Sequence, residues 1–416
     1  MKRYRLIVAV GAVVSLTAAL SGSSAYGGSS GTAQGSPIKL GVLTALSASG
    51  GTNFSPWGLQ VRAGAALAVN EINRSGGIKG RGQGRRINLV VADSQDNNTS
   101  AAIDGFRRLT QQEGVVSVGG IIGSPIGGAT TRLAEEGKIP LFLVKSGNNE
   151  ILTRSSRYTF RTCLPAAAMV AQSVVQLAQR REIRSVGVMI ADYAWGQSFK
   201  SSLEDAAKSA PNIRFSIQVA PVPTTNFTPY LRSFGDVSLI VATGHPPGAP
   251  LVLAQAGQLG LKAPVVGADG PWSLTAKSTT TSAFGRYSDF KCMATASKQY
   301  KALAKRYLRT FPQNEFMEDD ALAGYAYVKI VAEAISKVGP NRQRIAAYVH
   351  ANTFNIPGYA WPLRWTPWGE MIGARPQYAI LTKGAPPEAG LNTASTTFWP
   401  RVIFKSAALT PYRPPS

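Results

Sequence analysis

The sequence predicts an α/β protein made of two similar units in tandem, each with a parallel sheet covered by helices. Short apolar runs of strand length alternate with stretches in which apolar residues recur at helical spacing, and the connections between them are short. The alternation occurs between residues 38 and 144 and resumes between residues 166 and 267. Two Rossmann-like units in tandem predict two lobes with a cleft between them.

The first unit begins with an apolar run at 38–43, after a Gly- and Ser-rich spacer. A helix is expected at 57–74, because apolar residues recur there at helical spacing and Ser75-Gly-Gly follows as a stop signal. Further strands are expected at 87–92, 115–122 and 139–144, and further helices at 100–113 and 127–136.

The second unit repeats the pattern. Helices are expected at 166–179, 196–207, 227–234 and 250–259, and strands at 185–190, 213–219, 237–242 and 264–267. Amphipathic stretches at 297–311, 319–338 and 342–351 follow. We expect the Pro-rich chain after Gly384 to be irregular and to lie on the surface, with one strand-like piece near 402–404.

The N-terminus is typical of an export signal. Residues 1–5 carry three positive charges, residues 6–20 are apolar, and the small residues that follow end at Ala25. The apolar run is short for a membrane span of about 20 residues, so cleavage near Ala25 is expected rather than an anchor. Ser23 stands where a bacterial lipoprotein would have its lipid-bearing Cys, so no lipidation is expected.

Composition excludes several classes of protein. Hydrophobic residues make up 44% of the chain and charged residues 16%, which argues against intrinsic disorder. The 416 residues include only two His and two Cys, which argues against zinc, iron–sulfur and most His-dependent catalysis. We therefore expect no metal and no cofactor.

The net charge of +22 is dispersed along the chain, with its densest clusters at 79–86 and 180–184. No nucleic-acid motif accompanies it, so we expect no nucleic-acid partner, only mild attraction to anionic solutes and membrane surfaces. Cys163 and Cys292 each follow a strand-like stretch, and an exported chain permits a disulfide between them. Two buried free thiols are the alternative.

Ligands of open parallel sheets bind at the carboxyl ends of the strands. The loops that follow the expected strands are rich in Ser, Gly, Asn and aromatic residues, and they lie at 45–57, 123–128, 145–150, 192–195, 243–248 and 269–272. Aromatic faces bury apolar groups, and loop amides with hydroxyls bind anions at helix N-termini. These loops therefore predict a site for a small solute.

An ordered set of short motifs runs across residues 37–384. They are Trp57-Gly, Arg62-Ala-Gly-Ala, Asn70-Glu-Ile-Asn, Gly76-Gly-Ile-Lys-Gly, Val90-Val-Ala-Asp-Ser-Gln-Asp, Ala134-Glu-Glu-Gly-Lys-Ile-Pro, Tyr158-Thr-Phe-Arg-Thr, Asp192-Tyr-Ala-Trp-Gly and Gln255-Ala-Gly-Gln-Leu-Gly-Leu-Lys-Ala-Pro. This ordered set resembles the leucine/isoleucine/valine-binding branch of the type I periplasmic binding proteins, the solute receptors of ABC importers.

The resemblance implies two α/β lobes joined by a three-strand hinge, with crossovers near 161–166, 293–296 and 352–362. We expect the first lobe at 37–161 plus 294–352 and the second at 162–293 plus 353–384. Residues 1–25 are then the signal peptide, and residues 385–416 a Pro-rich C-terminal extension. It also implies a periplasmic protein.

The resemblance assigns ligand contacts position by position. Trp57 matches an aromatic residue that lines the cleft, and Ser124 matches a hydroxyl that holds the ligand carboxylate. Ser146 and Asn148 match the next loop, and Tyr193 and Trp195 match the aromatic wall of the second lobe. Four of these six residues have a structural alternative: Trp57 as core, Ser124 as a helix N-cap, Asn148 as a turn residue and Tyr193 as a cap of its strand.

The chain departs from the amino-acid binders of this family. Asn148 replaces their Thr, and the loop Gly244-His-Pro-Pro-Gly-Ala lacks the acid that binds the ligand ammonium group. Asp269 is the remaining acid in place, as an ammonium partner or an Asx-turn residue. Trp272 either lines the cleft or packs on the surface. The ligand is accordingly an amino acid held through Asp269, or an acid without an amine.

We expect a monomer that captures a small carboxylate by hinge closure and delivers it to an inner-membrane ABC permease. A sensory receptor of the same fold, for an aromatic or short-chain acid, an amide or urea, is the alternative. An enzyme is not expected, because no G-x-G-x-x-G follows the first strand and no nucleophile pairs recognisably with His245.

Overall fold

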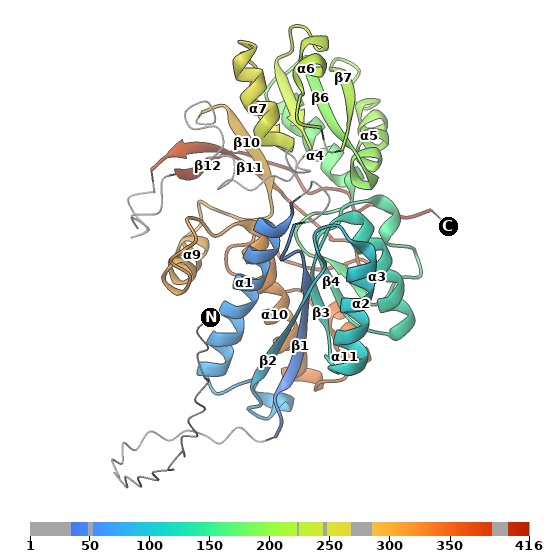
Figure 1. The fold of residues 1–416 in the computed structure, drawn as a ribbon, viewed down its shortest axis with the longest axis vertical. Helices are drawn as coiled ribbons and strands as arrows, with labels where there is room; N and C mark the ends of the chain where they lie inside the picture. Colours follow the sequence, from blue (N-terminus) through green and yellow to red (C-terminus); the bar gives the residue numbers. More distant parts are fainter. Residues whose placement is uncertain are drawn as a thin grey trace, which may run out of the picture. The chain divides into compact units, whose positions relative to one another are not determined.

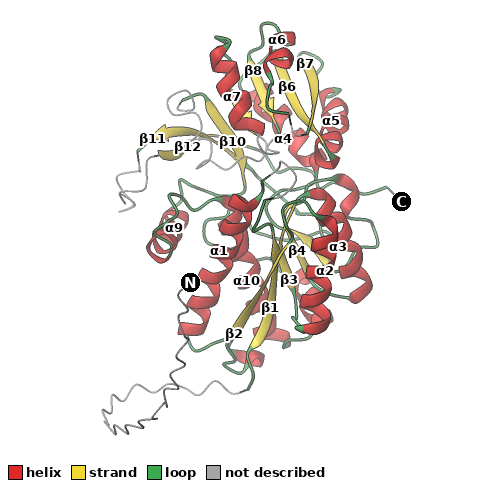
Figure 2. Ribbon diagram, viewed as in Figure 1, coloured by secondary structure: helices red, strands yellow, loops and turns green. Residues whose placement is uncertain are grey.

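The computed structural model describes residues 35–48, 53–222, 224–243, 248–267, 285–384 and 398–415. Its compact unit extends from Ala33 to the C-terminus, and two separate sheets form its framework (Figures 1 and 2). The expected export signal lies outside the described residues. No helix in the described ranges has the length and apolar character needed to cross a membrane.

The first sheet has the strand order β2-β1-β3-β4-β5, and all its pairs are parallel. Its strands are β1 (Ile38–Thr44), β2 (Ile87–Asp93), β3 (Val118–Ile122), β4 (Leu141–Lys145) and β5 (Thr159–Arg161). Its helices are α1 (Ser55–Arg74), α2 (Thr99–Arg107), α3 (Ser124–Gly137), α10 (Asp319–Val338) and α11 (Arg342–Ala351). Figure 1 shows α1 and α10 on one side of this sheet and α2 and α3 on the other.

Strand alternation divides the core of this first sheet into two halves. Phe142 and Val144 of β4 pack in the cluster that contains α1 and α10, whereas Leu141 and Leu143 pack in the cluster that contains α2 and α3. All four side chains are fully buried, as expected for a parallel strand covered on both faces.

The second sheet has the strand order β12-β11-β10-β9-β8-β6-β7. Its parallel strands are β6 (Ser185–Asp192), β7 (Arg214–Pro221), β8 (Leu239–Ala242), β9 (Val265–Gly267) and β10 (Tyr287–Lys291). Antiparallel β11 (Gln377–Lys383) and β12 (Phe398–Lys405) extend it beyond β10. The remaining helices are α4 (Ala167–Arg180), α5 (Ala194–Ala207), α6 (Thr228–Ser233), α7 (Gly248–Gln258) and α9 (Lys298–Thr310).

The predicted α/β fold with two parallel-sheet cores is confirmed, and each strand and helix predicted in the two units is present. Two differences concern the C-terminal part. Strand β11 was not predicted, because its apolar run, Tyr378 to Leu381, is short and lies outside the alternating strand and helix pattern of the two units. Strand β12 is longer than the expected piece, and Phe398 and Trp399 at its start are buried rather than on the surface.

The chain passes from the first sheet to the second after β5 and returns after β10. Cys163, two residues after β5, and Cys292, the residue after β10, form a disulfide that joins the two crossovers. The structure thus decides between the paired and the free thiols.

The third crossover was expected near 352–362. Within that range, Tyr359 forms a bridge with Met293 of the crossover after β10. Further along the chain, Trp365 donates from Nε1 to the carbonyl oxygen of Arg161 at 2.6 Å and packs edge-on against Phe160. The amide of Arg161 also donates to the carbonyl oxygen of Gly369. The place of the third crossover near 352–362 stays a prediction.

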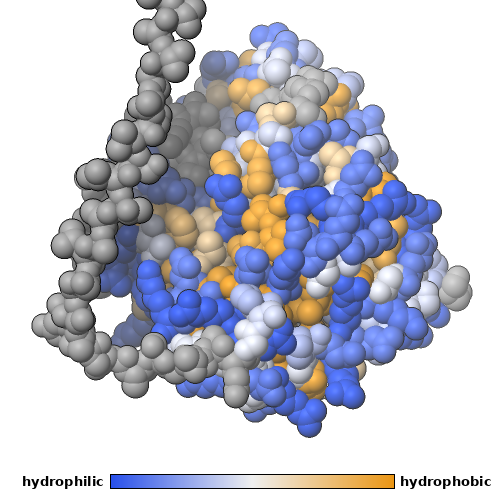
Figure 3. Space-filling model, turned by 60° about the horizontal axis from the view of Figure 1, so that its bottom comes forward, coloured by the Kyte–Doolittle hydropathy of each residue, from blue (hydrophilic) through white to orange (hydrophobic). Residues whose placement is uncertain are grey.

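Figure 3 shows one face on which hydrophilic residues surround a narrow apolar band. Leu59 of α1, at 44% exposure, is the large hydrophobic side chain that stands out as exposed among the described residues.

Candidate functional site

The loops after β3 and β4 are joined directly by their side chains. The hydroxyl oxygen of Ser124, at the start of α3, accepts a hydrogen bond from the amide of Asn148 at 3.1 Å. The hydroxyl of Ser146, the first residue after β4, donates to the carbonyl oxygen of Gly123 at 3.0 Å. The structure thus brings together three residues predicted for the site, and we call the segment 146–149 the β4 loop.

Ser124 does not cap its own helix. The N-cap of α3 is Gly123, whose φ of 86° suits glycine, and no side chain caps the helix. Ser124 is buried, and its oxygen accepts from the β4 loop. A hydroxyl that accepts one bond keeps its own proton, so Ser124 still offers a donor at the positive end of a helix dipole.

Asn148 shapes its own turn and also contacts the start of α5, a helix of the second unit. Its side-chain oxygen accepts from the amide of Glu150 at 2.7 Å and caps the short helix Asn149–Ile151. Its Nδ2 donates to the carbonyl oxygen of Ala194 at 3.0 Å, at the start of α5. The turn assignment is supported, and Asn148 also links the β4 loop to the loop after β6.

Trp195 lies against this β4 loop. It is 2% exposed and stacks on Phe199 with ring centroids 5.2 Å apart. A Cβ placed on Gly147 would lie 2.2 Å from Trp195 Nε1, so the indole fits only because residue 147 is glycine. The Nε1 atom has no hydrogen-bond partner among the described residues. A buried donor without an acceptor is costly, which makes this N–H a candidate for a ligand oxygen.

The other aromatic candidates lie in different environments. Tyr193 is half-buried as the N-cap of α5, with its ring 6.4 Å from that of Trp195. Trp57 is 3% exposed within α1 and packs in the large core cluster against Phe54, at 5.3 Å between ring centroids. This is the environment of a core residue, and its ligand contact stays a prediction. Asp269, Trp272 and the loop with His245 lie outside the described residues.

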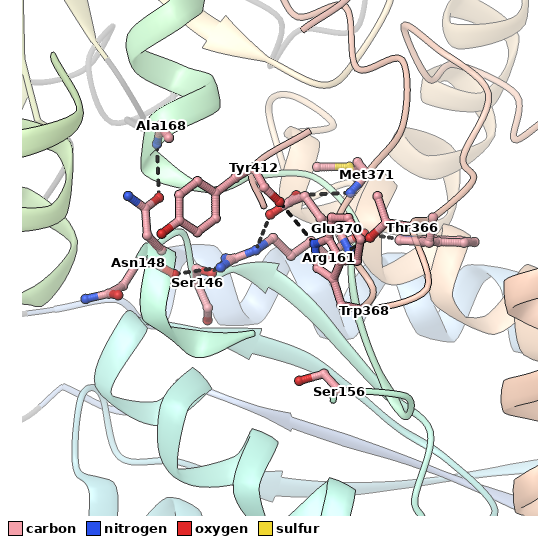
Figure 4. A network of polar contacts seen from close by, with 12 residues as sticks. Ser146, Asn148, Ser156, Arg161, Ala168, Thr366, Trp368, Glu370, Met371 and Tyr412 are labelled. Carbon is pink, nitrogen blue, oxygen red and sulfur yellow. Dashed lines mark hydrogen bonds and ion pairs between the residues drawn. The ribbon is translucent and has the colours of Figure 1, made fainter. Parts of the chain in front are cut away.

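Sequence reasoning missed the residue that supports the β4 loop from behind. Arg161 is fully buried and donates to the carbonyl oxygens of Ser146 and Asn148, the latter at 2.6 Å (Figure 4). Its Nε lies 3.0 Å from Oε2 of Glu370, which is also buried. Burial lowers the pKa of Arg161, and the nearby charge of Glu370 offsets only part of this effect. Burial likewise raises the pKa of Glu370, and the charge of Arg161 offsets only part of that increase. The sequence signal that could have pointed to Arg161 is its place as the charged residue inside the matched run 158–162.

A second buried ionic cluster lies at the junction of β4, β10 and α10. Lys145 Nζ lies 3.2 Å from Asp319 and 3.0 Å from Asp320, and Lys291 Nζ lies 3.3 Å from Asp319 and 3.1 Å from Asp289. Burial would raise the pKa of Asp319, but Lys145 and Lys291 outweigh it and hold the pKa below its usual value. The cluster therefore ties the first sheet to the second through paired charges.

The potential metal ligands that lie close together in the described ranges are Cys163, Cys292 and Asp319. Both sulfurs belong to the disulfide, so they are not the thiolates that a metal would need. This cluster does not fit a metal.

A groove of about 790 Å³, which we call the polar groove, opens beside the β4 loop. Amide, hydroxyl and acidic side chains predominate in its lining, which consists of Asn148, Asn149, Glu150, Ala168, Gln172, Ala194, Gln197, Ser198, Ser201, Ser202, Asp205, Ala206 and Tyr412. Asn149 joins the β4 loop to α5 within this lining: its backbone amide donates to Ser198 Oγ at 3.0 Å, and its Nδ2 donates to Ser202 Oγ at 2.9 Å.

Residues 37–373 match the family model described as periplasmic binding protein. The chain belongs to the periplasmic binding protein family. This binding protein is 26% identical over 298 residues to the Leu/Ile/Val-binding protein homolog 7 of Brucella suis biovar 1 (strain 1330), a match that covers 66% of this chain and 72% of that protein. The resemblance to the leucine/isoleucine/valine-binding branch is thereby confirmed.

Solved structures show the same fold. The substrate-binding protein LivJ of Streptococcus pneumoniae, in complex with isoleucine, aligns with a TM-score of 0.72 at 20% identity, over 89% of this chain and 100% of that chain. A solute-binding protein of R. palustris in complex with benzoate aligns with a TM-score of 0.72 at 16% identity, over 90% and 98%. Identities this low carry the fold alone.

Proposed function

We propose that this binding protein captures a small carboxylate with an apolar body outside the cytoplasm and delivers it to an ABC permease in the inner membrane. Hinge closure traps the solute, because a ligand that contacts both sheets' loops binds the closed state more tightly than the open one. It acts as a monomer, releases the solute unchanged and catalyses no reaction.

The observation that carries the proposal is a pair of buried donors on either side of the β4 loop. The Ser124 hydroxyl proton comes from the first sheet's side, and the Trp195 indole N–H from the second. The described residues supply no acceptor for Trp195 Nε1. A carboxylate has acceptor oxygens only, so it matches two donors that come from two elements next to the β4 loop.

The family's range supports both kinds of ligand that the sequence left open. One structural neighbour was solved with isoleucine and another with benzoate. An amino acid needs an anionic partner for its ammonium group, and Asp269 is our candidate, with Trp272 and Tyr193 as further walls and Trp57 as the contact from the first loop. A benzoate-like acid needs no such partner.

The first test is a thermal-shift screen of the mature protein against amino acids, aromatic acids, short-chain acids, amides and urea. A solute at about one hundred times its Kd raises the free energy of unfolding by about 2.7 kcal/mol. We expect a shift with a carboxylate and none with the matching amide. Preference for the amide, or conversion of the solute to a product, would refute the proposal.

The second test substitutes the hydroxyl donor. Ser124→Ala removes one hydrogen bond to the ligand, so carboxylate affinity in calorimetry is expected to fall about tenfold, or ~1.4 kcal/mol. Ser209→Ala, at an exposed serine two residues beyond the end of α5, is the matched control and leaves affinity unchanged. Equal affinities of the Ser124→Ala variant and the parent protein would remove Ser124 from the site.

A further inference from the structure

The last ten described residues leave the second sheet after β12 and contain neither helix nor strand. This segment, 406–415, lies beyond the region that matches the family. We propose that it is a strap that fastens the two sheets' elements to each other and so sets how far the binding protein opens and how long it retains its solute. The part about solute retention rests on the proposed function.

One end of the strap is anchored on the second sheet's side. Ser406 Oγ lies 2.8 Å from Ser173 Oγ of α4, and the amide of Leu409 donates to the carbonyl oxygen of Ala374 at 2.9 Å. Gln172 of α4 holds Thr410 in both directions: Thr410 N donates to Oε1 at 3.0 Å, and Nε2 donates to Thr410 O at 3.2 Å. Leu409 is 2% exposed. Paired polar contacts and a buried apolar anchor define a docked segment rather than a loose end.

The other end of the strap is anchored on the first sheet's side. Trp368 Nε1 donates to the carbonyl oxygen of Tyr412 at 3.0 Å, and Arg154 Nε donates to that of Pro414 at 2.8 Å. Trp368 packs against the core cluster of α2 and α3, and Arg154 lies in the loop between β4 and β5. Pro414 is buried. If the two sheets separate, one of these two anchors must break.

Tyr412, between the anchors, brings the strap next to the site. It lines the polar groove with Asn148 and Glu150, and Figure 4 shows its ring beside Arg161 and below Ala168. Burial and the charge of Glu150 raise the pKa of Tyr412. The strap therefore lies against the same β4 loop that Arg161 holds from behind, and a displaced strap would expose that support.

The test releases each anchor in the full-length protein. Gln172→Ala and Arg154→Ala, singly and combined, remove contacts at opposite ends of the strap. Arg413→Ala is the matched control, because Arg413 is an exposed strap residue that makes no hydrogen bond or ion pair with the described residues. Spin labels on Asp104→Cys of α2 and Asn212→Cys before β7, both exposed positions, report the distance between the two sides by pulsed EPR without ligand.

We expect the distance distribution of the double variant to broaden toward longer values and that of Arg413→Ala to stay unchanged. With L-isoleucine or benzoate as the probe, dissociation of the bound probe should be about five- to tenfold faster, the effect of losing one or two net hydrogen bonds. Unchanged distances in folded anchor variants overturn the strap, whatever binds.

The two proposals fail separately. Longer distances without binding of any solute would support the strap as a mechanical link and refute the proposed function. Normal binding with unchanged distances and dissociation rates would support the proposed function and refute the strap. A chain ending at Lys405 gives the same readouts with the whole strap removed, and the full-length anchor variants decide the question if that chain fails to fold.

Discussion

Arg161 shows how a single buried charge can organise a binding loop. Its guanidinium donates to two carbonyl oxygens of the β4 loop and pairs with Glu370 through Nε. A planar fork of donors can serve three acceptors at once, which a lysine ammonium cannot match in geometry. The polar side chains of the site are therefore placed by a residue that itself has no exposed atoms to offer a ligand.

Arg161→Ala is expected to lower the free energy of unfolding by about 3–5 kcal/mol, because Glu370 is left as an unpaired buried carboxylate. Urea unfolding measures the change. Arg132→Ala, on the exposed face of α3, is the control and should change stability by less than about 0.5 kcal/mol. A double variant, Arg161→Met with Glu370→Leu, should recover much of the loss. If it unfolds as easily as the single variant, the unpaired charge is not the cause.

At the scale of the elements, α1 and α10 approach each other at glycine positions. A Cβ on Gly64 would lie 1.8 Å from the carbonyl oxygen of Ala321, and a Cβ on Gly324 would lie 2.2 Å from that of Val61. Each helix thus presents its glycine to the backbone of the other. The close contact places α10, and with it Asp319 and Asp320 at its start, near the end of β4.

Gly64→Ala is expected to destabilise the protein by about 1–3 kcal/mol despite the better helix propensity of alanine, because the two helices must move apart. Gly128→Ala in α3 is the matched control, since nothing lies within 4 Å of its added Cβ. That change should stabilise by about 0.5–1 kcal/mol. Thermal unfolding of both variants checks the prediction, and equal shifts would contradict the close approach.

The disulfide links elements that are 129 residues apart in the sequence. Constraining a loop of this size restricts the unfolded chain, so the Cys163→Ser/Cys292→Ser variant should lose about 3–5 kcal/mol of unfolding free energy. The melting temperature of the parent protein should fall on addition of a reductant, and that of the double variant should not respond. A reductant effect on the variant would assign the change to something other than this bond.

For the molecule as a whole, the charge of +22 is the property that acts at long range. Binding to anionic phosphatidylglycerol vesicles is expected in about 10 mM salt and should be lost by about 300 mM, because the Debye length falls from roughly 30 Å to below 10 Å. Co-sedimentation at the two salt concentrations measures it, with neutral vesicles as the control. Binding to the anionic vesicles that does not depend on salt would mean that apolar contacts, rather than charge, hold the protein on the membrane.

Sequence reasoning succeeded where the signal was local and repeated. Strands such as β4 and β6 are continuous apolar runs, because a parallel strand is buried on both faces. Helices such as α10 are recognised by apolar residues that recur at the helical period. It failed for β11, whose strand character depends on its neighbours β10 and β12. Of the site, the grouping of Ser124, Ser146 and Asn148 follows from strand ends meeting at one edge, but the role of Arg161 does not.

The amino-acid order alone determined the α/β class, the two tandem units and the loops in which polar and aromatic side chains gather, because periodicity and strand ends are properties of neighbouring residues. Only the tertiary structure decided that Cys163 and Cys292 pair, that Trp57 is buried, that Arg161 supports the β4 loop and that residues 406–415 dock on both sides. These facts depend on groups that are far apart in the chain, and local pattern carries no information about which distant groups will meet.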